Sequence, residues 1–172
     1  ALPGLTLSQG DVKSCRDVLD TQVRDIKDGL FPNLGESYNS VDAALWFFWT
    51  LQQFEKHVGA KDVWESYGAK MKEVLEAFRR GIGEWVAVDA NGLVRAGHPT
   101  LAMTWMDAVV DGKPVTGREG YQVEVNALWY NALKFCHSTL HDNKKASMRN
   151  AISDIIEQIE VSFRQTFLNV HG

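Results

Sequence analysis

The sequence contains few cysteines and none of the local patterns in which cysteine usually acts. Its 172 residues include two, Cys15 and Cys136, which lie far apart and form no CxxC pair. An even set of closely spaced cysteines would be typical of a small secreted domain held by disulfides. Its absence favours two buried thiols in a reducing compartment, and we expect a cytoplasmic protein.

Basic clusters and long apolar runs are also missing. Lysine and arginine total 18 against 22 acidic residues, so the formal net charge is −4 at pH 7. Without a basic patch, the chain is a poor match for nucleic acid or an anionic membrane surface, and we expect neither partner. No window holds the roughly 18 apolar residues of a membrane span. The hydrophobic content of 45% still suffices for one core, and we expect a single domain over residues 1–172.

Sequence motifs for bound metals and cofactors are absent as well. His137 and His141 form the one histidine pair with a spacing of four residues, and no HExxH motif or third ligand accompanies them. No GxSxG motif, phosphate-binding loop or dinucleotide fingerprint occurs. We therefore expect no metal and no cofactor, which leaves any chemistry to carboxylates.

Apolar periodicity predicts helices through most of the chain. Segments 11–29, 61–83 and 142–168 repeat apolar residues at three- and four-residue steps, which is typical of helices with one face in water. Segments 40–58 and 123–137 are apolar on most sides, which predicts buried helices. Since half-exposed and buried helices alternate, the sequence predicts an all-α fold that forms part of a ring of helical hairpins.

Two segments interrupt the helical pattern. Residues 85–97 contain two short β-prone runs around Asn91-Gly92, which predicts a small β-hairpin insertion. Residues 108–120 are rich in glycine and directly follow Asp107. Loops of this kind commonly carry function, so we expect this segment to fold over a ligand at Asp107.

The candidate active site lies in two neighbouring blocks of sequence. Asp107 closely follows Trp105, while Glu124 and Asn126 begin a predicted helix that carries further aromatic residues. Carboxylates split glycosidic bonds by acid and base catalysis, and sugar rings stack on aromatic faces. The two blocks therefore indicate a site that cleaves sugars.

Three blocks in a fixed order carry a family resemblance. They are Tyr38-Asn39-Ser40-Val41-Asp42-Ala43 with Leu45-Trp46-Phe47, then Thr104-Trp105-Met106-Asp107-Ala108, then Val123-Glu124-Val125-Asn126-Ala127-Leu128-Trp129-Tyr130-Asn131-Ala132-Leu133. With segments 2–7 and 28–33, they resemble the glucosidase domain of glycogen debranching enzymes over essentially the whole chain. The resemblance implies an (α/α)6 toroid, a six-hairpin glycosidase that removes the α-1,6-linked glucose left at branch stubs during glycogen breakdown.

The resemblance also implies a mechanism with two carboxyl groups, one of which is missing from this sequence. Related toroid glycosidases invert configuration with two carboxyl groups about 6.5–9.5 Å apart. Asp107 matches the general acid, and the apolar neighbours Trp105 and Met106 are expected to favour its protonated form. The family's general base lies near the far end of the toroid, and no block in this sequence matches it. We therefore expect a central segment of a larger toroid that does not turn over alone.

Six further residues are candidate substrate contacts, and each has a structural alternative. They are Asp42, Trp46, Trp105, Arg118, Glu124 and Asn126. Asp42 suits either a sugar hydroxyl or the first turn of a helix, where the macrodipole favours negative charge. Glu124 and Asn126 suit sugar hydroxyls or a helix cap. The tryptophans provide stacking faces or core packing, and the arginine suits the substrate, the acid or a structural role.

Two residues depart from the family pattern in the loop beside Asp107. Gly117 stands where the family has proline, and Tyr121 stands where it has lysine. Glycine loosens a loop that proline would fix, and tyrosine replaces a charge by an aromatic donor. The departures therefore bear on substrate preference and not on the fold.

Rival functions and several partners stay open at this point. The rivals are a carbohydrate-binding or structural helical module without catalysis, and another toroid glycosidase such as a trehalase-like enzyme. The expected partners are an α-glucan or oligosaccharide, and either the remainder of the toroid or a second copy. We expect inner-helix aromatics such as Phe47, Phe48 and Trp49 to be exposed and to make this chain self-associate, because large apolar patches favour association.

Overall fold

The computed structural model describes residues 1–33, 37–139 and 146–168. The described α-helices are α1 (Leu2–Leu5), α2 (Val12–Gln22), α3 (Val41–Val58), α4 (Ala60–Arg80), α5 (Val123–Thr139) and α6 (Ala146–Phe167). Two short 3-10 helices, η1 (Leu7–Gln9) and η2 (Val23–Asp25), flank α2. Two small β-hairpins complete the described elements, and the predicted all-α class is confirmed.

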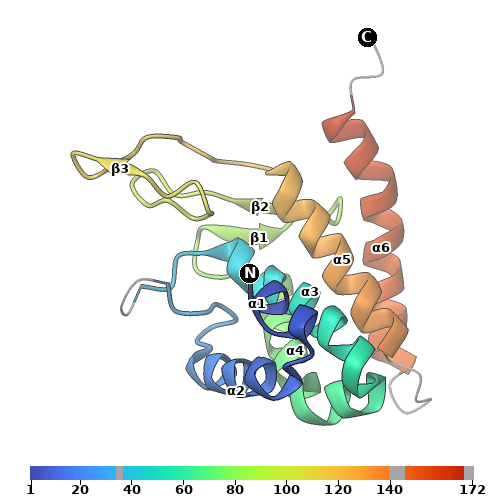
Figure 1. Ribbon diagram of the computed structural model, residues 1–172. Helices are drawn as coiled ribbons and strands as arrows, with labels where there is room; N and C mark the ends of the chain where they lie inside the picture. The colour runs from blue at the N-terminus through green and yellow to red at the C-terminus, as the bar shows by residue number, and fades with distance from the viewer. Residues whose placement is uncertain (34–36, 140–145, 169–172) are drawn as a thin grey trace.

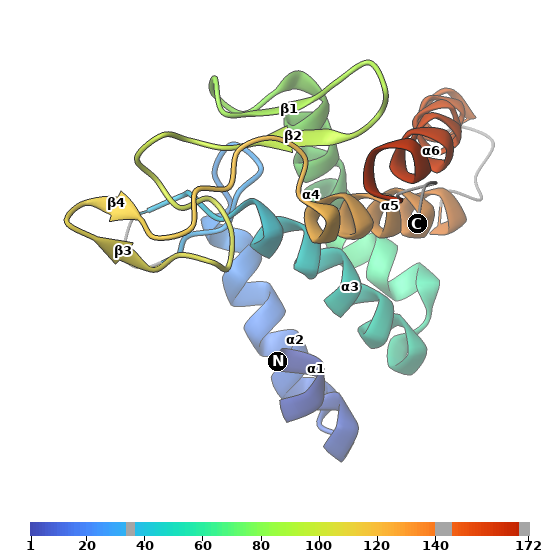
Figure 2. The same ribbon diagram turned by 90° about the horizontal axis from the view of Figure 1, so that it is seen from above.

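The long helices differ in how much of their surface is buried. Helices α3 and α5 pack against each other and bury side chains on several faces. Helix α4 packs on both of them, α2 packs on α3, and α6 packs on α5. Figures 1 and 2 show α6 beside α5 at one side of the molecule and α2 at another. This order of outer and inner helices is the one that the apolar periodicity predicts.

The core is centred where α3, α4 and α5 meet. Trp129 of α5 is fully buried and stacks on Phe78 of α4, with ring centroids 5.5 Å apart. Its indole Nε1 donates a hydrogen bond of 3.2 Å to the carbonyl oxygen of Gly92, so the polar edge of the ring is also satisfied. Phe47 and Phe48 of α3 are buried in the same cluster. The expectation that these two phenylalanines form an exposed patch is therefore wrong.

The helix predicted over residues 11–29 ends earlier than expected. Helix α2 stops at Gln22, and a tight turn follows at Asp28 and Gly29, whose φ angles are 51° and 80°. Lys27 and Leu30 exchange two backbone hydrogen bonds of 3.0 Å across this turn. A Cβ atom on Gly29 would lie 2.3 Å from the Cβ of Ala77, so the turn depends on glycine for its close approach to α4.

The remaining predicted helices agree more closely with the structure. Helices α3, α4 and α5 begin within one residue of their predicted starts. The predicted start of the last helix, at Asp142, lies outside the described residues, and α6 ends at Phe167. None of the described helices is both long and apolar enough to cross a lipid bilayer.

The predicted hairpin is present as β1 (Val86–Val88) and β2 (Val94–Ala96), which pair antiparallel. Its turn closes through a 2.8 Å hydrogen bond from the Gly92 amide to the Asp89 carbonyl oxygen, and Gly92 has a φ of 81°. The turn is therefore a type I turn followed by a left-handed glycine.

A second hairpin, β3 (Val109–Val110) and β4 (Lys113–Pro114), lies within the glycine-rich loop. Its turn residues Asp111 and Gly112 both have positive φ, as an Asp-Gly turn favours. Figures 1 and 2 show this hairpin extending away from the helices, and its valines are exposed. The sequence pattern led us to expect only a loop here, although the Asp-Gly pair was the available signal.

We predict that Gly92→Ala destabilises the chain more than Gly112→Ala. Both glycines have positive φ, so both variants carry backbone strain of about 1 kcal/mol. A Cβ on Gly92 would also lie 3.0 Å from Cγ1 of Ile159 and 3.2 Å from the carbonyl oxygen of Ile155, whereas Gly112 has no atom within 4 Å. We expect a total loss of about 2–4 kcal/mol for Gly92→Ala in urea denaturation. Equal losses in the two variants would show that contact with α6 adds nothing.

Candidate active site

Asp107 lies on an irregular segment between β2 and β3. Its carboxyl is exposed, and it has no hydrogen bond or ion pair among the residues that the structure describes. Trp105 is 63% exposed, and Met106 is also exposed. The apolar surroundings expected around Asp107 are therefore not formed by these two neighbours.

Asp42 connects the start of α3 to the segment that carries Asp107. The residue is only 3% exposed. One carboxylate oxygen, Oδ1, accepts hydrogen bonds from the Ser40 hydroxyl at 2.6 Å and from the Ala43 amide at 3.1 Å. The other oxygen, Oδ2, accepts the backbone N–H of Trp105 at 3.0 Å. Both oxygens of this buried carboxylate are thus used by the protein itself.

Two more contacts join the same two segments. The Val41 amide donates to the Met103 carbonyl oxygen at 3.0 Å. The Asn39 side chain donates to the Ala102 carbonyl oxygen at 2.6 Å. Ser40 occupies the predicted N-cap position of α3, but its hydroxyl donates to Asp42 instead of accepting a helix N–H. Residues 39–42 therefore hold residues 102–105 through a set of short polar contacts.

A second set of contacts surrounds Glu124, in the first turn of α5. Arg118 forms an ion pair with the Glu124 carboxylate and donates a 3.1 Å hydrogen bond to the Thr104 hydroxyl. The indole Nε1 of Trp105 donates to the same Glu124 oxygen at 3.2 Å. The Arg118 hydrogen bond is the main cause that lowers the pKa of Glu124, and burial acts in the opposite direction. The pKa of Arg118 is raised by the same pair.

The structure thus brings four of the predicted site residues into one connected network. They are Asp42, Trp105, Arg118 and Glu124. Trp105 is the central member, because its backbone binds Asp42 and its indole binds Glu124. Thr104 joins the network as an acceptor that sequence reasoning did not single out. Its place in the block before Asp107 was the one signal for it.

Asn126 is not accessible to solvent. It is fully buried, its Oδ1 accepts the Val94 amide at 2.7 Å, and its Nδ2 donates to the carbonyl oxygens of Val94 and Gln122. The buried Gln122 side chain donates in turn to the carbonyl oxygens of Ala96 and Arg118. These amides fix β2 to the start of α5, a structural role that differs from both the sugar contact and the helix cap considered for Asn126.

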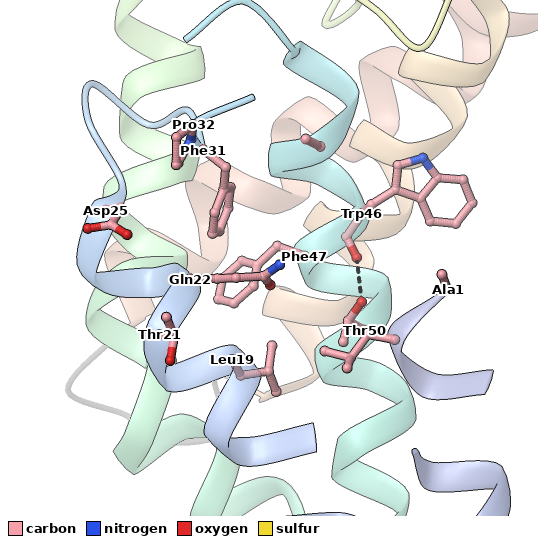
Figure 3. Close-up of a pocket in the computed structure, with 12 residues that line it drawn as sticks. Ala1, Leu19, Thr21, Gln22, Asp25, Phe31, Pro32, Trp46, Phe47 and Thr50 are labelled. Carbon is pink, nitrogen blue, oxygen red and sulfur yellow. Dashed lines mark hydrogen bonds between the residues drawn. The ribbon is translucent and has the colours of Figure 1, made fainter. Parts of the chain in front are cut away.

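Trp46 is not part of the network around Trp105. It is 47% exposed on α3, and its ring lies 5.5 Å from that of Trp49 in an edge-on arrangement. It borders a pocket of about 410 Å³ between α2 and α3, which Leu19, Gln22 and Phe47 also line. Figure 3 shows the indole on the side of α3 away from the Phe47 ring. None of the other predicted site residues lines this pocket.

Tyr121, which stands where the family has lysine, makes contacts within the structure. Its hydroxyl donates to the Asp89 carboxylate at 2.8 Å and accepts from the Asn91 side chain at 3.3 Å. Burial is the larger cause of its raised pKa, and the bond to Asp89 adds to it. Gly117, the other departure, is exposed in the loop, and a Cβ atom added there would meet no atom within 4 Å. Tyr121 therefore secures the β1–β2 turn.

The described residues offer no evident place for a metal ion. No cluster among them contains three or more histidine, cysteine, aspartate or glutamate side chains able to hold an ion. His141, half of the histidine pair in the sequence, lies outside the described residues. The arrangement around Trp105 can supply carboxyl groups, an exposed aromatic face and hydrogen-bond donors, which are the groups that bind and cleave sugars.

A helical domain with an exposed carboxyl beside an exposed tryptophan fits the glycosidase class of enzymes. The family model described as amylo-alpha-1,6-glucosidase matches residues 1–172, and the chain belongs to this family. The comparison with curated proteins gave no match. The family supports a glycosidase domain of the glycogen-debranching type.

We predict that the contribution of Glu124 to stability depends on pH. Its pKa is lowered in the folded chain from an ordinary value of 4.5. The stabilisation is therefore present above that value and is lost as the pH falls through the folded pKa. Glu124→Gln should cost about 1 kcal/mol in urea denaturation at pH 7 and much less at pH 3.

Glu119→Gln is the matched control for this experiment. Glu119 is exposed and has no hydrogen bond or ion pair among the described residues. Its replacement should leave the stability nearly unchanged at both pH values. If Glu124→Gln lowered the free energy of unfolding by the same amount at pH 7 and pH 3, the ionised carboxylate would not be the source of the stabilisation.

Proposed function

We propose that the chain forms part of a debranching-type glucosidase and supplies its general acid, Asp107. The substrate would be an α-1,6-linked glucose at a branch stub of an α-glucan, cleaved during glycogen breakdown in the cytoplasm. The observation that carries the proposal is the exposed, unpaired carboxyl of Asp107 two residues from the exposed Trp105 ring, on a segment anchored to α3. The family membership of the whole chain supports it.

In this mechanism, the Asp107 carboxyl gives its proton to the glycosidic oxygen as the bond from that oxygen to C1 of glucose breaks. A second carboxylate takes a proton from water, and the water oxygen bonds to C1 from the opposite face. The configuration at C1 is inverted, and free glucose leaves. The exposed face of Trp105 is suited to stack on a sugar ring beside the acid.

The two carboxylates of the network, Asp42 and Glu124, are poorly suited to be the general base. Asp42 is buried, and both of its oxygens accept hydrogen bonds from the protein. Glu124 accepts from Arg118 and Trp105, and its lowered pKa makes it a weak proton acceptor. We therefore place the base on another part of a larger toroid, to which α2–α6 contribute alternating outer and inner helices.

The exposure of Asp107 also supports an active site shared between this chain and other parts of a larger toroid. A general acid needs surroundings that favour its protonated form near neutral pH. Trp105 and Met106 leave the Asp107 carboxyl open to solvent in this chain. In the proposed toroid, other segments would cover this face and exclude water from the acid.

A non-catalytic carbohydrate-binding function is the second candidate. The observation that favours it is the same exposed Trp105 ring, because ring stacking requires no acid. Titration calorimetry with a branched oligosaccharide distinguishes the candidates when it is combined with the activity assay below. Binding without glucose release in a longer protein would favour the binding module.

We predict that Asp107→Asn abolishes glucose release from an α-1,6-glucosyl limit dextrin. The assay uses a longer protein that contains this chain, because the proposed base lies elsewhere. Loss of the transferable proton should lower kcat about 10²–10⁴-fold. Asp111→Asn is the matched control, since Asp111 lies on the same exposed loop and asparagine tolerates its positive φ. Undiminished release by Asp107→Asn would refute the assignment of the acid.

A further inference from the structure

The contacts around Asp42 suggest a role different from the sugar contact expected from the sequence. A direct sugar contact requires an accessible oxygen, but Asp42 is 3% exposed and its oxygens accept three protein donors. A buried carboxylate is costly unless it is hydrogen-bonded in this way. The donors come from two segments that lie 63 residues apart in the sequence, which Asp42 therefore joins.

The joined segment is the one that ends at Asp107. The Trp105 amide is bound by Asp42, the Met103 carbonyl by the Val41 amide, and the Ala102 carbonyl by the Asn39 side chain. Beyond Trp105, the backbone amides of Met106 and Asp107 have no hydrogen bond among the described residues. The last fixed point before the acid is thus the bond between Asp42 and the Trp105 amide.

We propose that Asp42 is a positioning residue that fixes the backbone at Trp105 and thereby places Asp107 and the Trp105 ring. This inference rests on the proposed role of Asp107. The negative charge of Asp42 also lies in the first turn of α3, where the helix dipole stabilises it. Placement of an acid within a narrow range of geometry is needed for efficient proton transfer, so a released segment would react slowly while still binding substrate.

The first test is residue-resolved amide hydrogen exchange of the 172-residue chain by NMR. In the unchanged chain, the Trp105 amide should exchange at least about tenfold more slowly than the Met106 amide, after correction for intrinsic rates. In Asp42→Asn, one acceptor oxygen is replaced by a donor group, and the Trp105 amide should exchange about tenfold faster. The amides of α5 serve as the reference and should change less than about twofold.

Asp107→Asn is the control variant for exchange, because the Asp107 side chain makes no contact that holds the segment among the described residues. It should leave the protection of the Trp105 amide unchanged. If Asp42→Asn fails to fold, the exchange rates of the Trp105 and Met106 amides in the unchanged chain still test the proposal. An unprotected Trp105 amide there would overturn the proposal, as would unchanged protection in a folded Asp42→Asn variant.

The second test separates positioning from direct binding of sugar. In the longer protein, Asp42→Asn should lower kcat at least about tenfold and change KM less than about threefold. A raised KM with an unchanged kcat would instead assign Asp42 to the substrate and overturn the inference. Full activity in Asp107→Asn would refute the proposed function alone, because the exchange experiment reports on the Asp42 contact independently of catalysis.

Discussion

The hydrogen bond between the Asp42 carboxylate and the Trp105 amide is the contact on which the candidate site depends. It joins the start of a buried helix, α3, to a segment that has no regular secondary structure. Trp105 then extends the connection to Glu124 on α5 through its indole, and Arg118 closes it back to Thr104. An irregular segment is thereby held by two helices that already pack against each other in the core. The contacts that hold the segment therefore come from the starts of the inner helices α3 and α5, together with Arg118 of the loop.

The sequence predicted the fold well where burial alone decides the structure. Helices α3, α4 and α5 follow apolar periodicity, because each must place a recurring set of side chains in one core. Prediction failed where a short turn overrides that pattern. Ile26 and Leu30 continue the apolar spacing of α2, but the helix ends at Gln22 and Ile26 is already extended, before Asp28 and Gly29 form the turn with positive φ. The β3–β4 hairpin was missed although Asp111-Gly112 is a favourable turn pair, because only two residues pair on each side.

The candidate site was predicted in composition but only partly in role. The family blocks indicated Asp42, Trp105 and Glu124, the neighbouring loop indicated Arg118, and the structure connects all four. Sequence spacing could not show that Asp42 binds a backbone amide far along the chain, or that Asn126 faces β2 instead of a ligand. Both side chains carry groups that suit sugar hydroxyls and backbone groups equally well, so the choice depends on tertiary contacts. Asp107 itself stays a prediction, because no contact within the described residues defines its role.

The pattern of hydrogen-bond partners separates Asp107 from the two carboxylates of the network, Asp42 and Glu124. Asp42 and Glu124 accept hydrogen bonds from amides, an indole and a guanidinium, so the protein itself occupies their oxygens. The hydrogen bond from Arg118 also lowers the pKa of Glu124. Asp107 is exposed and has no such donor among the described residues, so of these three carboxyl groups it is the one that a bound molecule can reach most directly. The network thus uses two carboxylates to hold the segment and leaves the Asp107 carboxyl accessible, as the proposed proton transfer requires.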